Sequence, residues 1–160
     1  MNPAHLHLLL NHVAILGSLF SLLIFISGRL MSENLLVRTA LIGFVFSALI
    51  SIPVFLTGEP AEELVEDLPG ITHEIIHSHE EAAEFSIWMI EILGLISLLS
   101  FFTADRFKRF LNLLILLFGF ISVVSLVYTG MEGGKIRHSE IRSDAPYTPL
   151  MNEEEHHKDK

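Results

Sequence analysis

The 160-residue sequence contains no cysteine. Disulfide bonds, iron–sulfur clusters, thiolate-bound haem and cysteine zinc sites are therefore excluded, and the available metal ligands are His, Asp, Glu and Met. Only five Met are present, which argues against a Met-rich copper(I) pathway. Basic residues are also few: 10 Lys and Arg stand against 19 Asp and Glu, and the formal net charge is -9. This balance argues against nucleic-acid binding and against a broad basic surface for anionic lipid.

Four long segments are almost free of charge: 8–27, 35–56, 85–102 and 110–128. Each approaches the roughly 20 residues that a helix needs to cross ~30 Å of hydrocarbon. The chain is 51% hydrophobic with a mean hydropathy of +0.53, which is unusual for a soluble domain. Continuous apolar runs exclude the alternating pattern of a membrane β-barrel. We therefore predict an all-α fold, a four-transmembrane-helix up-down bundle in a lipid bilayer.

The predicted membrane domain covers residues 1–135, with helices at about 6–29, 34–57, 73–104 and 108–130. Residues 58–72 are predicted to form an acidic outer loop. Residues 136–160 are predicted to form a polar outer tail whose end, NEEEHHKDK, is disordered because it has no apolar face. The first apolar run lacks a preceding Lys or Arg and a nearby cleavage site, so we expect it to persist as a helix.

Lys and Arg near the predicted helix ends indicate the orientation. The two short loops carry Arg29, Arg38, Arg106, Lys108 and Arg109, and residues 58–82 carry no Lys or Arg. The positive-inside rule then places the short loops in the cytoplasm, and both termini outside a bacterial inner membrane. Three basic residues near the end of the chain oppose this trend: Lys135, Arg137 and Arg142.

The chain resembles two helical hairpins in tandem. HLHLLLNH opens the first predicted helix and HEIIHSHEE opens the third, while FLTGEPAEE ends the second and YTGMEGGK ends the fourth. The shared Thr-Gly pair indicates a helix stop with glycine in the left-handed position. Each helix also carries a glycine near its middle, which allows close packing or leaves room for a flat cofactor.

Two histidines are predicted to face each other inside the bundle. At about 100° per residue, His79 shares a helix face with the small residues Ala83 and Ser86, so we expect it to point inward. His12 lies about one turn inside an apolar run, where an imidazole needs a partner, and His7 points nearly the opposite way. Because both helices begin on one membrane side, His12 and His79 would suit haem b iron. The alternative is that His12 hydrogen-bonds a neighbouring Ser or carbonyl.

A second face of the third predicted helix carries potential metal ligands: His73, His77, Glu80 and Glu84. Imidazole and carboxylate suit a Zn, Cu or Fe ion. HEIIH also matches the zincin motif, in which Glu74 would be the general base. The position before a membrane helix and the lack of a clear third ligand argue against a metalloprotease.

Glu91 lies deeper on this second face. A lone carboxylate in a membrane is costly unless it is protonated or paired. Glu91 is therefore a candidate proton carrier or quinone-site acid, and the alternative is a neutral Glu bonded to a neighbouring helix.

His138 follows the fourth predicted helix on the same side, in GGKIRHSEIR. Gly133 and Gly134 would let the chain turn back toward the bundle, so that His138 covers the outer end of a cofactor. Lys135 and Arg137 would then pair with haem propionates. The alternative is a solvated turn histidine.

These motifs resemble a family of four-span bacterial membrane proteins, a domain of unknown function that is grouped with the di-haem cytochrome b561-like bundles. The resemblance rests on HLLLNH at His7 and His12, HEEAAE at His79, and TGMEGGKIRH ending at His138. It covers most of residues 5–138 and implies these four histidines as ligands. Further potential ligands depart from the family pattern and leave open whether the site holds haem, another metal or both: His5, His73, His77 and Glu80.

The first functional hypothesis is a membrane haem-b-type electron-transfer protein or subunit. It would pass electrons between a quinol or small reductant and a periplasmic redox partner. One alternative is a non-haem Cu, Zn or Fe protein. Another is a structural or pigment-binding subunit of a larger membrane complex.

Overall fold

The computed structural model describes residues 2–68, 70–138 and 141–142, which are all-α. It has four long helices, α1 (Pro3–Met31), α2 (Asn34–Leu56), α4 (His73–Ser100) and α5 (Asp105–Arg137), and one short helix, α3 (Gly58–Glu62). The four long helices are each long and apolar enough to cross a membrane. By helix length and hydropathy the chain is a multi-pass membrane protein with four spans, as predicted.

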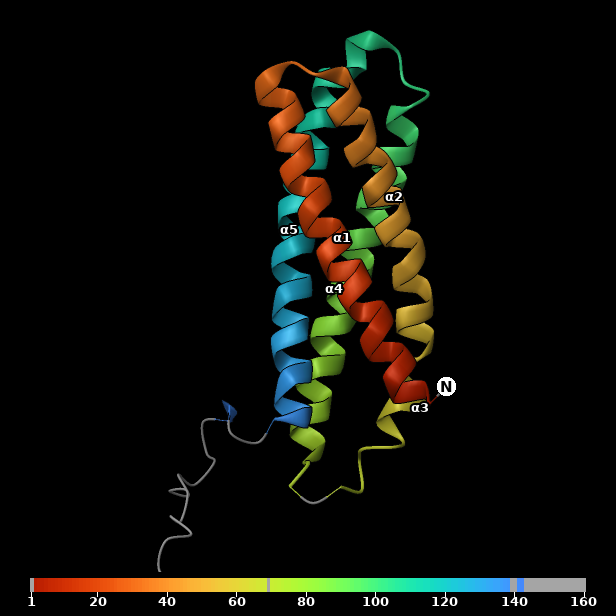
Figure 1. The fold of residues 1–160 in the computed structure, drawn as a ribbon, viewed down its shortest axis with the longest axis vertical. Coiled ribbons are helices and arrows are strands. Elements are labelled where there is room, and N and C mark those ends of the chain that lie inside the picture. Colours follow the sequence, from red (N-terminus) through yellow and green to blue (C-terminus); the bar gives the residue numbers. More distant parts are fainter. Residues whose placement is uncertain (1, 69, 139–140, 143–160) are drawn as a thin grey trace, which may run out of the picture.

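The long helices pack side by side as a bundle (Figure 1). Both α1 and α4 pack against α2 and α5, so α1 and α4 occupy opposite corners. The starts of α1 and α4, the end of α5 and α3 lie at one end of the bundle (Figure 1). We call it the histidine end, because it carries His5, His7, His73, His77 and His79. The other end, which we call the basic end, carries the short connections 32–33 and 101–104.

Local sequence fixes where the helices begin and end. The Asn2 side chain accepts a hydrogen bond of 2.9 Å from the Ala4 N–H, and Pro3 occupies the first helical position of α1. Ser32 adopts a left-handed conformation with φ 58°, which ends α1 and turns the chain into α2. Thr72 caps α4 by accepting from the Ile75 N–H. These caps set the register in which α1 and α4 present their side chains.

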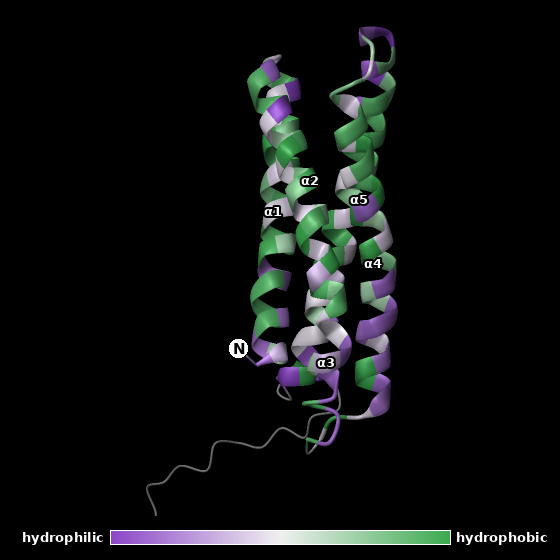
Figure 2. Cartoon of the chain, turned by 90° about the vertical axis from the view of Figure 1, so that its right-hand side faces the viewer, coloured by the Kyte–Doolittle hydropathy of each residue, from purple (hydrophilic) through white to green (hydrophobic). Residues whose placement is uncertain are grey.

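Hydrophobic residues extend along the long helices, and hydrophilic residues concentrate toward the ends of the bundle (Figure 2). Large apolar side chains point outward along every long helix, with Leu30 81% and Phe102 82% exposed. So much exposed apolar surface indicates contact with lipid. The interior instead holds a compact apolar cluster that includes Phe25, Phe44 and Leu93.

Small residues bring the helices close together. A Cβ at Gly94 of α4 would overlap the Cβ of Ala48 of α2. The predicted role of this mid-helix glycine in close packing is therefore confirmed. Buried serines fill much of the remaining interior, and among the described residues the hydroxyls of Ser47, Ser97 and Ser122 are buried without a hydrogen-bond partner.

The two hairpins repeat one packing pattern. Six buried residues of α1 each have a buried counterpart 72 positions later in α4: Ala14/Ser86, Ser18/Ile90, Ser21/Leu93, Leu22/Gly94, Phe25/Ser97 and Gly28/Ser100. Four buried pairs separated by 75 positions relate α2 to α5: Ala40/Ile115, Phe44/Gly119, Ser47/Ser122 and Ser51/Leu126. The second hairpin has three more residues at its turn, which accounts for the change of offset.

This register differs from the one that the sequence motifs predict. The sequence motifs pair Thr57-Gly58 with Thr129-Gly130, 72 positions later. The offset between α2 and α5 in the structure is 75 positions, so Gly58 corresponds to Gly133. The expected helix stop at Thr129-Gly130 is also wrong. Helix α5 continues through all three glycines to Arg137, beyond the predicted end near residue 130. The predicted polar tail beyond residue 142 lies outside the described residues.

Candidate functional site

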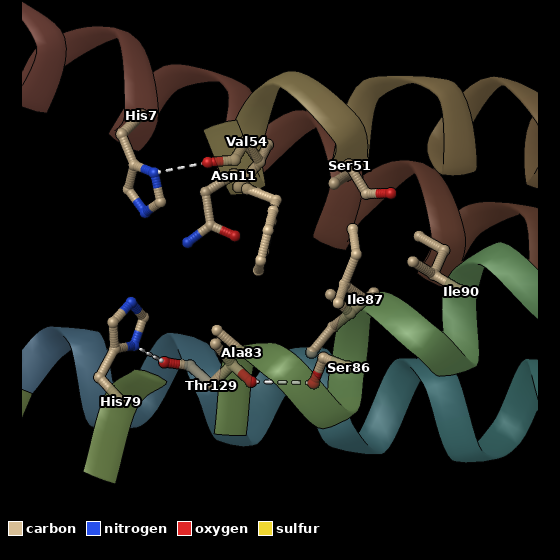
Figure 3. Close-up of a pocket in the computed structure, with 13 residues that line it drawn as sticks. His7, Asn11, Ser51, Val54, His79, Ala83, Ser86, Ile87, Ile90 and Thr129 are labelled. Carbon is tan, nitrogen blue, oxygen red and sulfur yellow. Dashed lines mark hydrogen bonds between the residues drawn. The ribbon is translucent and has the colours of Figure 1, made fainter. Parts of the chain in front are cut away.

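Two imidazoles meet at the histidine end of the bundle, His7 from α1 and His79 from α4 (Figure 3). Their ring centroids are 6.3 Å apart, and the ring planes are nearly perpendicular at 82°. The rings are part-buried and come from opposite corners of the bundle, so they close its interior at this end. Each ring turns one nitrogen toward a backbone carbonyl and the other toward its partner (Figure 3).

The end of α2 anchors His7. Its Nδ1 lies 3.0 Å from the Val54 carbonyl oxygen and 3.3 Å from Thr57 Oγ1. Val54 is in the last turn of α2, where carbonyl oxygens lack the regular helical partner. Its carbonyl oxygen also accepts from the Thr57 N–H at 3.2 Å and from the Thr57 hydroxyl at 2.9 Å. The Thr57 hydroxyl donates back to the Pro53 carbonyl over 2.8 Å, so its oxygen accepts from the imidazole. A carbonyl only accepts, so Nδ1 carries the proton and Nε2 presents a lone pair toward His79.

Helix α5 anchors His79 in the same way. Its Nδ1 lies 3.1 Å from the Thr129 carbonyl oxygen. Gly133, one turn further along α5, has no side chain to obstruct the ring. The Thr129 hydroxyl donates to the Ser125 carbonyl over 3.0 Å and accepts from Ser86 Oγ at 2.9 Å, which ties α4 to α5 beside the ring. His79 therefore also presents its Nε2 lone pair toward the centre.

The anchors follow the internal repeat. His7 and His79 are related by the offset of 72 positions, and their carbonyl partners Val54 and Thr129 by the offset of 75. Gly58 and Gly133 share the latter offset and are the glycines nearest the two rings: a Cβ at Gly58 would lie 3.9 Å from Cε1 of His7. Each hairpin thus contributes one histidine, one carbonyl acceptor and one nearby glycine at equivalent positions.

A small cavity of about 80 Å³ lies between the two rings and the bundle interior (Figure 3). Small or polar side chains line one part of it, among them Asn11, Ser51 and Ala83, and Ile87 and Ile90 line the apolar part. Since a water molecule occupies about 30 Å³ in the liquid, this volume holds an ion or a few waters. It is smaller than the roughly 300–1,000 Å³ of typical small-molecule sites.

His12 does not face His79, and that expectation is wrong. Its ring is exposed on the outer surface of α1, where Nδ1 lies 2.6 Å from the Leu8 carbonyl of the same helix. The inward stripe of α1 is set by Ala14 and Ser18, and two turns before Ala14 it passes through His7. His12 and His7 point nearly opposite ways, so only one of them reaches the interior. The role of His12 as a cofactor ligand stays a prediction.

The predicted metal face of α4 lies on the outer surface. All four residues of this face are exposed: His73, His77, Glu80 and Glu84. His77 lies 3.8 Å from Glu80 and 3.4 Å from Glu81. Within the described part of the chain, no three or more His, Asp or Glu side chains gather in a way that would hold a metal ion. Metal binding at this face stays a prediction.

Glu91 is paired across the bundle. Its Oε1 accepts a hydrogen bond of 2.8 Å from Ser51 Oγ of α2, and Ser51 also lines the cavity below the histidine pair. The carboxyl group is half-buried and joins α2 to α4. This is the hydrogen-bonded arrangement named above as the alternative, while a role in proton transfer stays a prediction.

The end of α5 is arranged differently from the expectation for His138. The chain does not turn back at Gly133 and Gly134, and His138 is the exposed C-terminal cap of α5, with its N–H bonded to the Gly134 carbonyl at 2.9 Å. Lys135 binds Glu132 at 2.7 Å, and Arg137 is exposed. Their contact with haem propionates stays a prediction.

Sequence reasoning missed several residues of the site. Glu132 is only 5% exposed although it carries a carboxylate, and it lies on α5 one turn from Thr129. The two carbonyl acceptors, Val54 and Thr129, carry no signal in side-chain chemistry. Their positions relative to Gly58 and Gly133, four residues further on in each case, are the signal that would have found them.

No protein-family model, no curated protein and no solved structure matches this chain. The class that the fold and the site define is an all-α, four-span membrane protein with two interior imidazoles facing each other at one end.

Proposed function

We propose that the chain is a haem-b-type electron-transfer protein or subunit, in which His7 and His79 would hold the haem iron. The geometry of this pair carries the proposal. An imidazole nitrogen binds a metal at about 2.0–2.1 Å, with its ring centre roughly 1.1 Å behind, so ligands on opposite sides of one metal have centroids about 6.3 Å apart. Two ligands of a tetrahedral metal would have centroids only about 5 Å apart. The observed separation is 6.3 Å.

The set of nearby donors favours a group that brings its own ligands. A metal held on opposite sides by two imidazoles has further positions between them. No larger group of His, Asp or Glu gathers within residues 2–68, 70–138 and 141–142. Haem b brings four pyrrole nitrogens and, when bound, supplies one-electron iron chemistry.

The protein's own residues would orient and tune such a pair. The carbonyls of Val54 and Thr129 hold both Nδ1–H groups, which fixes the tautomer and makes each Nε2 a better donor. Ile90 and Leu126 line the cavity on the inner side, where they keep water away from the ligands. Burial and hydrogen bonding of the ligands are the means by which a protein sets a haem potential.

The cavity volume favours a second candidate, a non-haem Cu, Zn or Fe site on the same two histidines. About 80 Å³ accepts an ion with water, whereas a porphyrin requires side chains such as Ile87 to move aside. Imidazole suits all three metals. The two candidates share their protein ligands and differ in the presence of a macrocycle.

The proposed location follows from charge. The basic end carries Arg29, Arg38 and Lys108, and the positive-inside rule assigns it to the cytoplasm of a bacterial inner membrane. Both ends of the described chain, and the histidine pair, would then lie at the periplasmic face. This position supports exchange of electrons with a quinol, a periplasmic redox protein or a larger membrane complex.

An absorption spectrum of the purified chain, oxidised and then reduced, tests the proposal. With haem supplied during expression, we expect a Soret band and a reduced α-band that are lost in His7→Ala and in His79→Ala. The exposed His77→Ala serves as control and should keep both bands. Stoichiometric Cu, Zn or Fe without a Soret band would select the second candidate. Neither haem nor metal would refute both.

A further inference from the structure

A second cavity lies at the basic end, about 420 Å³ in volume. It opens between the two hairpins, which diverge toward this end (Figure 2). Its volume falls within the roughly 300–1,000 Å³ of typical ligand sites. The histidine pair lies at the opposite end of the bundle, so this cavity is independent of the proposed redox role.

Cationic and amide side chains line the rim of this cavity. Arg29 of α1, Arg38 of α2 and Lys108 of α5 converge on it from three helices, and Asn34 and Asn112 add amide groups. Lys108 binds Asp105 at 2.7 Å. Within the described part of the chain, neither Arg29 nor Arg38 has a hydrogen bond or an ion pair. The cavity therefore presents two guanidinium groups that are free to bind an anion, and no acidic side chain lines it.

The start of α2 adds to this positive field. Asn34 is the first residue of α2, and the preceding Glu33 makes no side-chain cap hydrogen bond. The first N–H groups of a helix lack intrahelical partners and carry partial positive charge, which favours an anionic group beside them. Guanidinium groups together with helix N–H donors suit a phosphate.

The floor of the cavity is apolar. Leu41 is only 4% exposed and belongs to the central core cluster, and Val37 and Phe101 pack against that cluster. A ligand that fills the cavity thus needs an anionic head and an apolar part. The surrounding surface is also apolar, since Leu30, Leu35 and Phe102 are all strongly exposed around this end. The cavity mouth therefore lies at head-group level in a bilayer.

We propose that this cavity binds one anionic phospholipid, with the phosphate held by Arg29 and Arg38 and the start of an acyl chain against Leu41. Basic pockets between membrane helices on the cytoplasmic side recognise such head groups. The cavity lining comes from both hairpins, so a lipid that fills the cavity would contact the diverging ends of both.

Thermal unfolding of the full chain in neutral detergent tests the proposal. Phosphatidylglycerol should raise Tm, and phosphatidylcholine should not. The Arg29→Gln/Arg38→Gln variant should need roughly tenfold more phosphatidylglycerol or more for half of the effect, since charge-assisted hydrogen bonds are lost. The matched control, Arg106→Gln/Arg109→Gln, removes the same charge at the same end but outside the cavity lining, and should behave like the wild type.

Three outcomes would overturn the proposal. Equal weakening in the control variant would show general electrostatic attraction. An equal rise in Tm with inorganic phosphate alone would identify a free anion in place of a lipid. Native mass spectrometry of the wild-type chain with phosphatidylglycerol should show one retained lipid, and none would refute the site even if the Arg29→Gln/Arg38→Gln variant fails to fold.

Discussion

Gly133 of α5 lies against the imidazole of His79: a Cβ at position 133 would come 3.0 Å from Cε1 and 3.2 Å from Nδ1 of that ring. Contacts this short require the ring to shift by a few tenths of an ångström, away from the Thr129 carbonyl that holds it. The absence of a side chain at position 133 therefore lets the His79 ring lie where it bonds the Thr129 carbonyl.

Alanine at position 133 is the first test of this relationship. Helix propensity alone would stabilise α5 by roughly 0.5–1 kcal/mol for either Gly133→Ala or Gly134→Ala. A Cβ at Gly134 meets only Ile141 Cδ1 at 3.5 Å, an ordinary contact. We therefore expect thermal unfolding to place Gly133→Ala below Gly134→Ala, and haem or metal affinity to fall in Gly133→Ala alone. Equal stability and affinity in the two variants would contradict the argument.

The second prediction separates His12 from the facing pair. His12→Ala removes an exposed imidazole, so the absorption bands should keep their position and intensity. His7→Ala and His79→Ala should abolish them. Loss of the bands in His12→Ala would restore the ligand set that the family resemblance implies.

The third prediction concerns the hydrogen bond between Ser51 and Glu91. Ser51→Ala leaves the half-buried carboxyl group without its partner, and the cost should be about 1–3 kcal/mol in unfolding free energy. Ser51→Ala should cost much less when Glu91→Leu is already present, because no carboxyl group then remains. Ser18→Ala is the matched control, since that hydroxyl bonds only its own helix at the Ala14 carbonyl. Additive costs for Ser51 and Glu91 would argue against the bond.

The fourth prediction is a pH dependence outside the membrane spans. Burial, and then the hydrogen bond and charge of Glu80, raise the pKa of Glu62 above its ordinary value; Glu66 adds to this shift and His73 opposes it. The folded chain then holds a proton that the unfolded chain releases. This contribution to stability is complete below the ordinary pKa of a glutamate and is lost as pH rises through the raised value.

Glu62→Gln should remove this pH dependence. The amide keeps the hydrogen bond to Glu80 but does not titrate, so Tm should fall less between pH 4 and about pH 7 than in the wild type. Glu63→Gln, an exposed neighbour with the same change of charge, is the control. A steeper fall in Glu62→Gln than in the wild type would have the wrong sign.

The fifth prediction concerns the orientation of the chain in the membrane. Because the chain contains no cysteine, a single introduced cysteine is the only site that a thiol reagent can label. We expect Glu33→Cys, at the basic end, to react with a membrane-impermeant maleimide only after cells are opened. Glu66→Cys, in the segment between α3 and α4, should react in intact cells. The reverse pattern would place the histidine pair at the cytoplasmic face and would contradict the periplasmic partners.

Hydropathy alone predicted the four helices, because a membrane span must satisfy its own backbone and leave its side chains apolar. Two of the starts, at Asn34 and His73, are as predicted. The end of α5 differs from the prediction, because glycine occurs both at helix ends and at close contacts inside a helix. Thr129-Gly130 has the composition of a helix stop, but in this helix a missing side chain at Gly133 makes room for a neighbouring ring.

The site was harder to predict than the fold. His79 faces inward as expected, because small residues on α4 mark its inward face clearly. On α1 the choice of His12 relied on its depth in the apolar run, whereas the inward face follows Ala14 and Ser18 and leads to His7. Depth along a helix and direction around it are independent, and only the second decides which imidazole reaches the centre.

The two constant offsets between the hairpins have an evolutionary consequence. They are the offsets expected if the two hairpins arose by duplication of one hairpin. A parallel homodimer of one ancestral hairpin would bring two identical histidines together at one end of the bundle, so the facing pair would have preceded gene duplication and fusion. Differences between the halves, such as Asn11 opposite Ala83, are then later specialisations of a site that began symmetric.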